Sequence, residues 1–371
     1  MKLCLILPKY GVSIHDPCFA PLGVLYISAM AKKLGHTVDF YNLNLWENQE
    51  IPLEDYDAIL LTGGDEFFGF NKMVAEQARS LGVKTVLGGA LATFRPQEMA
   101  RYFDSVVVGE GEGVLADALA EDGIFQRNPI PFSEIPWPDY DGFGIDEYHK
   151  RHSVRYMAVM TSRGCPFRCS FCVQTCAYRE RPMADVFSEI DHYRDRYKIE
   201  TLVVCDNTLN VRKLRFMEFC DGMGSRGLKW SAAIRTDRFD EQMAVAAKKS
   251  GCEYFVVGVE SFIQRRLDMM NKGTFVVNNT RTLDLLHKHG IKYHGNLIMG
   301  FEGETVSDIM AEFVSVPKSY NLFPVLLQPF AGIKAKPGIF GKDREVISQT
   351  FREFAESKGM SCYPDAEVAN E

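Results

Sequence analysis

Residues 161–175 decide the fold of this chain, and they read TSRGCPFRCSFCVQT. Cys165, Cys169 and Cys172 have the spacing Cys-x3-Cys-x2-Cys, and the apolar residues 156–160 before them predict a buried strand. Three thiolates on one short loop can hold three irons of a [4Fe-4S] cluster and leave the fourth iron without a protein ligand. The stretch therefore predicts a strand, a cluster-binding loop and an open coordination site for a small molecule.

A zinc site and plain buried thiols are the alternatives for these cysteines. A zinc site needs four ligands, usually in two Cys-x2-Cys pairs separated by a dozen or more residues. Cys176 offers a fourth thiolate, but all four would then crowd one turn. Plain buried thiols would not require the regular spacing. Cys176, Cys205, Cys252 and Cys362 are themselves interpreted as packing or incidental thiols.

Composition and charge limit the class of protein. The 371 residues are 46 % hydrophobic and 25 % charged, which is ordinary for a globular chain long enough for two domains. A net charge of −7 offers no basic footprint, so we expect no nucleic-acid substrate. The first residues do not form a signal peptide, and no apolar run approaches the roughly 20 residues that cross a bilayer. We therefore expect a reducing cytoplasm, where thiols stay free, and no membrane partner.

The first third of the chain alternates strands and helices, which predicts a doubly wound parallel sheet of the flavodoxin or Rossmann type. Helices are expected at 21–34 and 71–81, and strands at 2–7, 37–41, 58–61, 84–87 and 105–108. Three of these strands run into glycines, at the edge where open α/β sheets bind ligands. A dinucleotide fingerprint is not expected, because its third glycine would fall on Val114.

A high density of prolines after residue 125 indicates that the alternation of strands and helices is interrupted there. Four prolines between residues 126 and 150 exclude a long helix and predict a linker. Strand–helix alternation then resumes, with six strands expected at 156–160, 201–205, 230–234, 253–259, 293–299 and 323–328. The predicted domains are 1–125, the linker 126–150, 151–332, and a tail 333–371 with one helix at about 343–358.

The cysteine spacing, the aromatic Phe171 before the third cysteine and the preceding strand together resemble the radical S-adenosylmethionine (SAM) enzymes. In that family the open iron chelates the amino and carboxylate groups of SAM, and an electron from the cluster cleaves SAM to a 5′-deoxyadenosyl radical. The resemblance implies a partial (β/α)6 barrel, Cys165, Cys169 and Cys172 as cluster ligands, and an external one-electron donor. It also implies that Phe171 lies near the adenine.

Further SAM contacts are implied at the ends of the barrel strands, where α/β barrels keep their sites. They are Asp206, Asn207, Arg235, Glu260, Ser261, Ile298 and Met299. The match is imperfect, because Cys205 replaces the first aspartate of the family's Asp-Asp-Asn segment and Glu302 stands where the family mostly has proline. Each of these residues could instead order a loop at the barrel rim. Residues 178–181 resemble a family segment after the cysteines, or are a solvated run of charges.

The first third resembles the cobalamin-binding domain that precedes the barrel in one class of radical SAM enzymes, on segments 21–29, 35–38, 55–59, 88–90 and 108–112. The implied cobalamin contacts are Leu22, Gly23, Thr62, Gly63, Gly64, Gly88, Gly89, Gly109, Glu110 and Gly111. The only histidines in this half, His15 and His36, do not form the Asp-x-His-x-x-Gly pattern. The resemblance thus implies base-off cobalamin without a histidine ligand, with 62–70 as the candidate stretch below cobalt.

The implied function is cobalamin-dependent C-methylation of an unactivated carbon. One SAM methylates the cobalamin, a second SAM is cleaved at the cluster, and the substrate radical takes the methyl group from methylcobalamin. Alternatives are a rearrangement or ring contraction, a non-radical methyl transfer with the same cofactors, or a radical SAM enzyme whose first domain is empty. From another class, an iron–sulfur redox sensor or binding module stays open. The short tail favours a small-molecule substrate, or a peptide.

Overall fold

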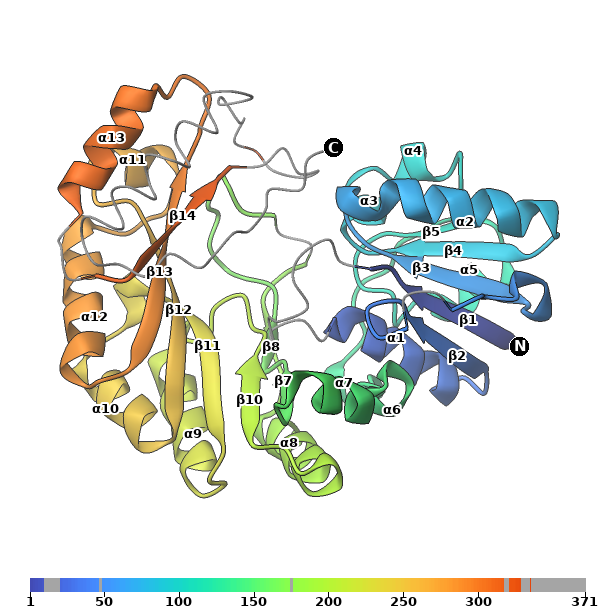
Figure 1. The fold of residues 1–371 in the computed structure, drawn as a ribbon, viewed down its shortest axis with the longest axis horizontal. Helices are drawn as coiled ribbons and strands as arrows, with labels where there is room; N and C mark the ends of the chain where they lie inside the picture. The colour runs from blue at the N-terminus through green and yellow to red at the C-terminus, as the bar shows by residue number, and fades with distance from the viewer. Residues whose placement is uncertain (10–20, 47–48, 174–175, 317–319, 328–333, 335–371) are drawn as a thin grey trace.

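The computed structural model describes residues 1–9, 21–46, 49–173, 176–316, 320–327 and 334. Two parallel sheets with their helices lie beside each other (Figure 1). The predicted tail helix and Cys362 lie outside the described residues. Within the described part, no helix is both long and apolar enough to cross a membrane.

Sheet A is formed by the first third of the chain. Its strand order is β2-β1-β3-β4-β5-β6, with every neighbouring pair parallel. The strands are β1 (Lys2–Leu7), β2 (Thr37–Asn42), β3 (Ala58–Thr62), β4 (Lys84–Gly88), β5 (Ser105–Val107) and β6 (Gly123–Phe125). The doubly wound sheet predicted from the sequence is confirmed. The strand β6 was not predicted, because three residues beginning with glycine carry too short a periodic signal.

Helices cover both faces of sheet A because successive strand residues point to opposite faces. Leu3 and Leu5 share a buried cluster with α1 (Leu22–Lys33) and α5 (Leu115–Ala120). Cys4 and Ile6 pack in a second cluster on the opposite face. The helices on that face are α2 (Phe68–Ser80), α3 (Ala90–Phe94) and α4 (Pro96–Met99). Two short 3-10 helices also occur in this half of the chain, η1 (Leu53–Asp55) and η2 (Asp65–Phe67).

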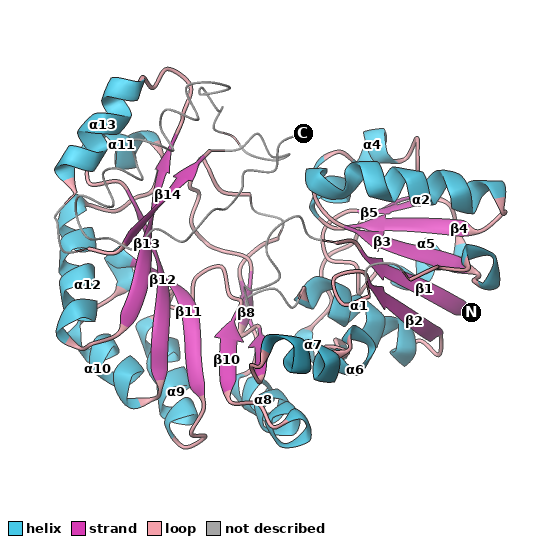
Figure 2. Cartoon of the chain, viewed as in Figure 1, coloured by secondary structure: helices cyan, strands magenta, loops and turns pink. Residues whose placement is uncertain are grey.

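Sheet B is the predicted six-stranded partial barrel, with the parallel order β14-β13-β12-β11-β10-β7. The strands are β7 (Tyr156–Val159), β10 (Thr201–Val204), β11 (Lys229–Arg235), β12 (Cys252–Glu260), β13 (Lys292–Met299) and β14 (Leu322–Leu326). Helices cover its outer side (Figure 2). They are α8 (Met183–Tyr197), α9 (Lys213–Gly224), α10 (Glu241–Lys249), α11 (Gln264–Met269), α12 (Val276–Lys288) and α13 (Val306–Ser315), with η4 (Thr236–Arg238).

A small antiparallel ladder closes the base of the cysteine loop (residues 164–178). It pairs β8 (Ser162–Arg163) with β9 (Arg179–Glu180), so that Arg163 lies opposite Arg179. Two-residue strands have no periodicity to read, and the sequence did not predict them. Arg179 and Arg181 are largely buried, so this segment is not a solvated run of charges.

The proline-rich segment packs against both halves of the chain. It holds η3 (Phe132–Glu134), α6 (Tyr140–Phe143) and α7 (Ile145–His152), so no long helix occurs, as expected. The buried Tyr140 donates a hydrogen bond to the Ala158 carbonyl of β7 at 2.5 Å. The predicted domain boundaries stay a prediction.

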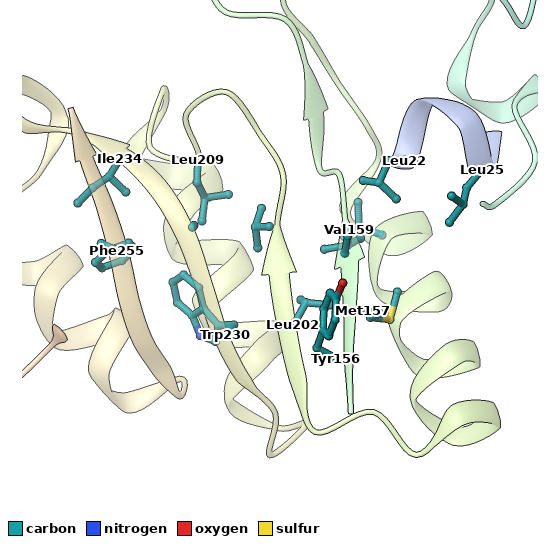
Figure 3. Packing of buried hydrophobic residues seen from close by; sticks show 14 of the residues in the cluster. Leu22, Leu25, Tyr156, Met157, Val159, Leu202, Leu209, Trp230, Ile234 and Phe255 are labelled. Carbon is teal, nitrogen blue, oxygen red and sulfur yellow. The ribbon is translucent and has the colours of Figure 1, made fainter. Parts of the chain in front are cut away.

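One continuous cluster of buried side chains joins the two halves. Leu22 of α1 belongs to it together with Val159 of β7 and Trp230 of β11, and Figure 3 shows Leu22 pointing toward Val159. Because the core is shared, the carboxyl edge of sheet A is held in place relative to the start of the cysteine loop.

Candidate active site

The cysteine loop is fixed on one side by the turn that follows α11. The Ser170 amide donates to the Met270 carbonyl at 2.9 Å, and Asn271 Nδ2 donates to the Arg168 carbonyl at 2.8 Å. The three predicted ligands, Cys165, Cys169 and Cys172, are all partly exposed. Their thiols are thus accessible to iron while the loop backbone between them is anchored.

Burial and the repulsion between neighbouring thiolates favour the protonated form of Cys165 and Cys172 in the metal-free protein. Burial, followed by the neighbouring Cys169 and Cys165, raises the pKa of Cys172 to about 11. Burial also raises the pKa of Cys165, against which Arg235 acts. No group of three or more His, Cys, Asp or Glu side chains in the described residues converges on one metal ion. A [4Fe-4S] cluster does not require that, because each thiolate binds a separate iron.

The structure brings the charged residue Arg235 directly to one of the predicted cluster thiols. Its Nη1 lies 3.6 Å from Cys169 Sγ, and its guanidinium stacks on Phe167 with 3.7 Å from Cζ to the ring centre. Its Nε donates to Asp237 Oδ1 at 2.9 Å, and Nη2 donates to the Lys272 carbonyl at 2.6 Å. These contacts fix a permanent positive charge beside the cluster ligands.

Glu260 and Lys272 form a buried pair beside the same thiols, and the Lys272 carbonyl is the group that accepts from Arg235. Lys272 Nζ lies 2.7 Å from Glu260 Oε1, and the side chains are only 5 % and 6 % exposed. Glu260 ends β12 with a left-handed φ of 65°, a strained conformation for a residue with a Cβ. Its Oε2 is buried without a hydrogen-bond partner among the described residues. A buried carboxylate oxygen without a donor is suited to an incoming ammonium or hydroxyl group.

Sequence reasoning missed Lys272. It examined strand ends, whereas Lys272 lies in the turn between α11 and α12. Its Nζ lies 5.7 Å from the centre of the Phe171 ring. No spacing rule singles out a lysine in a turn, so only the folded chain places it at the site.

Two of the predicted SAM contacts, Asp206 and Ser261, are engaged in hydrogen bonds within the chain, and a third, Asn207, is exposed. Asp206 is buried and accepts four hydrogen bonds, from the amide and hydroxyl groups of Thr161 and Ser162, at 2.6 to 3.1 Å. Ser261 donates to Glu312 Oε2 at 2.5 Å, and Asn207 is exposed. Asp206 therefore fixes the start of the cysteine loop, and the SAM contacts predicted for these three residues stay predictions.

Phe171 and Ile298 belong to a small apolar cluster, whereas Met299 is buried in the main core. Phe171 and Ile298 pack in one cluster with Met270, Phe301 and Leu327. The Ile298 carbonyl accepts from Arg266 at 2.7 Å, and the Met299 carbonyl accepts from the Leu327 amide at 2.8 Å. The side chains of Phe171 and Ile298, rather than these carbonyls, are available to a flat apolar ring.

The glycine-edge cavity is a space of about 280 Å³ between sheet A and the cysteine loop. Seven of the ten predicted cobalamin contacts line it, namely Gly23, Thr62, Gly88, Gly89, Gly109, Glu110 and Gly111, whereas Leu22, Gly63 and Gly64 do not. Leu22 is instead buried in the core. The barrel half contributes Met160, Arg163, Gly164, Cys176 and Asn207 to the wall. One cavity therefore touches both the glycine edge and the cysteine loop.

Two glycines at this edge are required by close packing within the chain itself. Gly89 has a φ of +91°, and a Cβ there would lie 3.0 Å from the backbone of Gly63. A Cβ on Gly111 would lie 2.8 Å from Ile27 Cδ1. His36 precedes β2, at the opposite edge of the sheet, and is hydrogen-bonded to the amino terminus at 3.3 Å. It therefore cannot reach a group in the cavity, and His15 lies outside the described residues.

Comparisons with known proteins identify both halves. The Radical SAM superfamily model matches residues 159–313, and the B12 binding domain model matches residues 16–119. This chain belongs to the cobalamin-binding radical SAM enzymes. The cofactors of this radical SAM enzyme are a [4Fe-4S] cluster, SAM and cobalamin, as predicted.

Two curated relatives are named methyltransferases. An uncharacterized methyltransferase of Pyrococcus horikoshii is 28 % identical over 359 residues, covering 84 % of this chain and 76 % of the relative. The bacteriochlorophyllide d C-12(1)-methyltransferase of Chlorobaculum tepidum is 27 % identical over 353 residues, covering 89 % and 76 %. The radical SAM methyltransferase TsrM of Kitasatospora setae has the same fold, with a TM-score of 0.72 at 18 % identity over 90 % of this chain and 76 % of TsrM.

Proposed function

We propose that this radical SAM enzyme is a methyltransferase that places a methyl group on an unactivated carbon. The observation that carries the proposal is the glycine-edge cavity, because its wall includes both the glycine edge of sheet A and Gly164, next to the first cluster ligand. The two methyltransferase relatives support the same reading. When bound, the cluster and cobalamin supply reductive cleavage of SAM and transfer of a methyl group.

The charged residues beside the thiols suit the polar end of SAM. Arg235 and Lys272 present positive charge to a carboxylate, and Glu260 Oε2 presents a free acceptor to the ammonium or a ribose hydroxyl. Phe171 and Ile298 form the apolar surface for the adenine. We propose that Asp206 acts on SAM only indirectly, because its carboxylate holds the strand–loop junction in place.

The glycine-edge cavity suits the nucleotide tail of a corrinoid in the base-off form. Its lining includes Gly88, Gly89 and Gly109, which have no side chains, and the apolar residues Leu60 and Val86. An apolar lining favours burial of an aromatic nucleotide base. No described histidine lies at this edge, so we propose that the chain binds cobalt without a histidine ligand.

The substrate, the electron donor and the compartment belong to the proposal as well. We propose a small molecule or a peptide as substrate, an external one-electron donor and a reducing cytoplasm. Neither a nucleic acid nor a membrane is part of the proposal, since the net charge is −7.

The test is an anaerobic reconstitution with iron, sulfide and hydroxocobalamin. The desalted protein is examined for corrinoid absorption, then given SAM and reductant, and 5′-deoxyadenosine and S-adenosylhomocysteine are measured. We expect retained corrinoid and both products, with 5′-deoxyadenosine lost in Cys165→Ala. Cys220→Ala is the matched control, because Cys220 is buried in α9 away from the loop.

Three outcomes would contradict the proposal in different ways. A cluster and SAM cleavage without retained corrinoid would mean that the first domain is empty. 5′-Deoxyadenosine without S-adenosylhomocysteine would favour a rearrangement. S-adenosylhomocysteine alone would favour polar methyl transfer without a radical.

A further inference from the structure

Two arginines form the neck of the cysteine loop. Arg163 lies immediately before the loop and Arg179 immediately after it, and they are partners in the β8–β9 ladder. Like charges directly opposite each other in a ladder repel, so this pair needs a counter-charge. The pairing of the two arginines with this counter-charge determines how stable the β8–β9 ladder is.

The counter-charge comes from the other half of the chain. Glu110 Oε2 lies 2.5 Å from Arg163 Nη1 and 2.5 Å from Arg179 Nη2. Glu110 Oε1 accepts a second bond from Arg179 Nη2 at 2.7 Å. Glu112 Oε1 accepts from Arg163 Nη2 at 2.6 Å. One carboxylate, Glu110, therefore bridges both sides of the neck, and Glu112 reinforces one side.

Three of the four side chains in the bridge are shielded from water, and the fourth, Arg179, is 25 % exposed. The Glu110, Glu112 and Arg163 side chains are 11 %, 5 % and 9 % exposed. The Arg163 guanidinium lies 4.9 Å from the Tyr26 ring centre, and that of Arg179 lies 4.7 Å from the Phe132 ring centre. Charge-assisted bonds in such a setting are strong and directional, and losing one partner leaves a buried charge uncompensated.

The same carboxylates line the glycine-edge cavity. Glu110 and Glu112 follow β5 in the segment 109–113, and both belong to the cavity wall together with Arg163 and Gly164. A group that enters the cavity must therefore contact the segment whose carboxylate holds the neck. A change at the neck can, in turn, be transmitted through Glu110 and Glu112 to the cavity wall.

We propose that Glu110 is a positioning residue that couples occupancy of the glycine-edge cavity to the conformation of the cysteine loop. The inference rests on the proposed corrinoid site in this cavity. Coupling between two sites is reciprocal, so a cluster on the loop tightens corrinoid binding by the same factor by which corrinoid stabilises the cluster. We expect a factor of about 5 to 10, at the low end of usual coupling strengths.

The experiment measures the hydroxocobalamin Kd of the full-length chain, anaerobically, in a cluster-loaded and a cluster-free form. The ratio of the two Kd values is the coupling factor. In the wild-type chain the cluster should lower Kd about 5-fold or more, and in Glu110→Gln the ratio should fall toward 1. A residue with a merely structural role would weaken both forms alike and leave the ratio unchanged.

Two further variants provide an independent test of the bridge and a control. Arg179→Gln removes the other partner of the bridge and should lower the ratio in the same way, so the test survives if Glu110→Gln does not fold. Asp122→Asn is the matched control, because Asp122 pairs with Lys84 at the amino end of β4, at the opposite edge of sheet A. Its ratio should equal that of the wild type.

The outcomes separate the coupling from the proposed function. A wild-type ratio of 1, or a ratio that survives in both Glu110→Gln and Arg179→Gln, would overturn the coupling while leaving the corrinoid site in place. Absence of corrinoid binding in both wild-type forms would overturn the proposed site and, with it, the coupling.

Discussion

Lys272 Nζ lies 2.7 Å from Glu260 Oε1, in a pair that is almost completely buried beside the cluster ligands. A buried ion pair adds little net stability, but removal of one partner leaves an unpaired charge that costs about 3–5 kcal/mol. In the proposed SAM site, the pair holds the carboxylate in place and leaves its Oε2 free.

Lys272→Met should therefore destabilise the cofactor-free chain by about 3 kcal/mol in urea unfolding. The double variant Lys272→Met/Glu260→Gln should recover part of that loss, since no unpaired charge is then buried. Additive losses in the double variant would show that the two side chains do not interact energetically.

Arg235→Lys should weaken SAM binding to the cluster-loaded protein about 10-fold, because a lysine keeps the charge but loses the stacked, forked geometry. Equilibrium dialysis with SAM measures the change. Arg238→Lys is the control, because Arg238 is exposed and lies 5.7 Å from the same Phe167 ring. Equal effects in both variants would mean that only general positive charge matters.

Asp206→Asn should lower iron retention after desalting and reduce the free energy of unfolding by about 2 kcal/mol. The carboxylate accepts four hydrogen bonds from Thr161 and Ser162, and an amide can accept only on one side. Asp195→Asn, at an exposed position on α8, is the control. Unchanged iron content in Asp206→Asn would contradict a positioning role for this residue.

Local patterns in the sequence were sufficient for the fold, because both sheets consist of apolar runs that end in glycine or polar residues. The β7 strand and the three cysteines are contiguous, so their relation needed no tertiary information. Arg235 was found because it ends a long strand. Strand β6 and the β8–β9 ladder were missed, since segments of two or three residues carry no periodicity.

The site itself depends on contacts between distant segments, which a single sequence does not encode in its spacing. Lys272 lies in a turn, and Glu110 reaches Arg163 and Arg179 over separations of 53 and 69 residues. Asp206 shows the opposite case. Its position at a strand end predicts a carboxylate that is free to bind a ligand, but in the structure this carboxylate is bonded to Thr161 and Ser162. Position at a strand end indicates the region of a site but not the partner of each side chain.

Glu189 gives the last prediction, because it is a carboxylate with no exposed surface, 2.7 Å from Arg181 Nη2. Neither carboxylate oxygen of Glu189 has a hydrogen-bond partner among the described residues. Burial, only partly offset by Arg181, raises the pKa of Glu189 from 4.5 to about 7. The folded chain therefore holds a proton here that the unfolded chain releases at lower pH.

A raised carboxyl pKa contributes stability below the unfolded value that is lost as pH rises through the folded value. The difference in unfolding free energy between the wild type and Glu189→Gln should therefore fall as pH rises from 5.5 to about 7, and then level off toward pH 8. The full change across both pKa values is on the order of 3 kcal/mol. Urea unfolding of the two proteins across this range measures the difference, and the glutamine variant cancels titrations elsewhere in the chain. Parallel curves for the two proteins would mean that Glu189 is ionised throughout, with Arg181 fully compensating its burial.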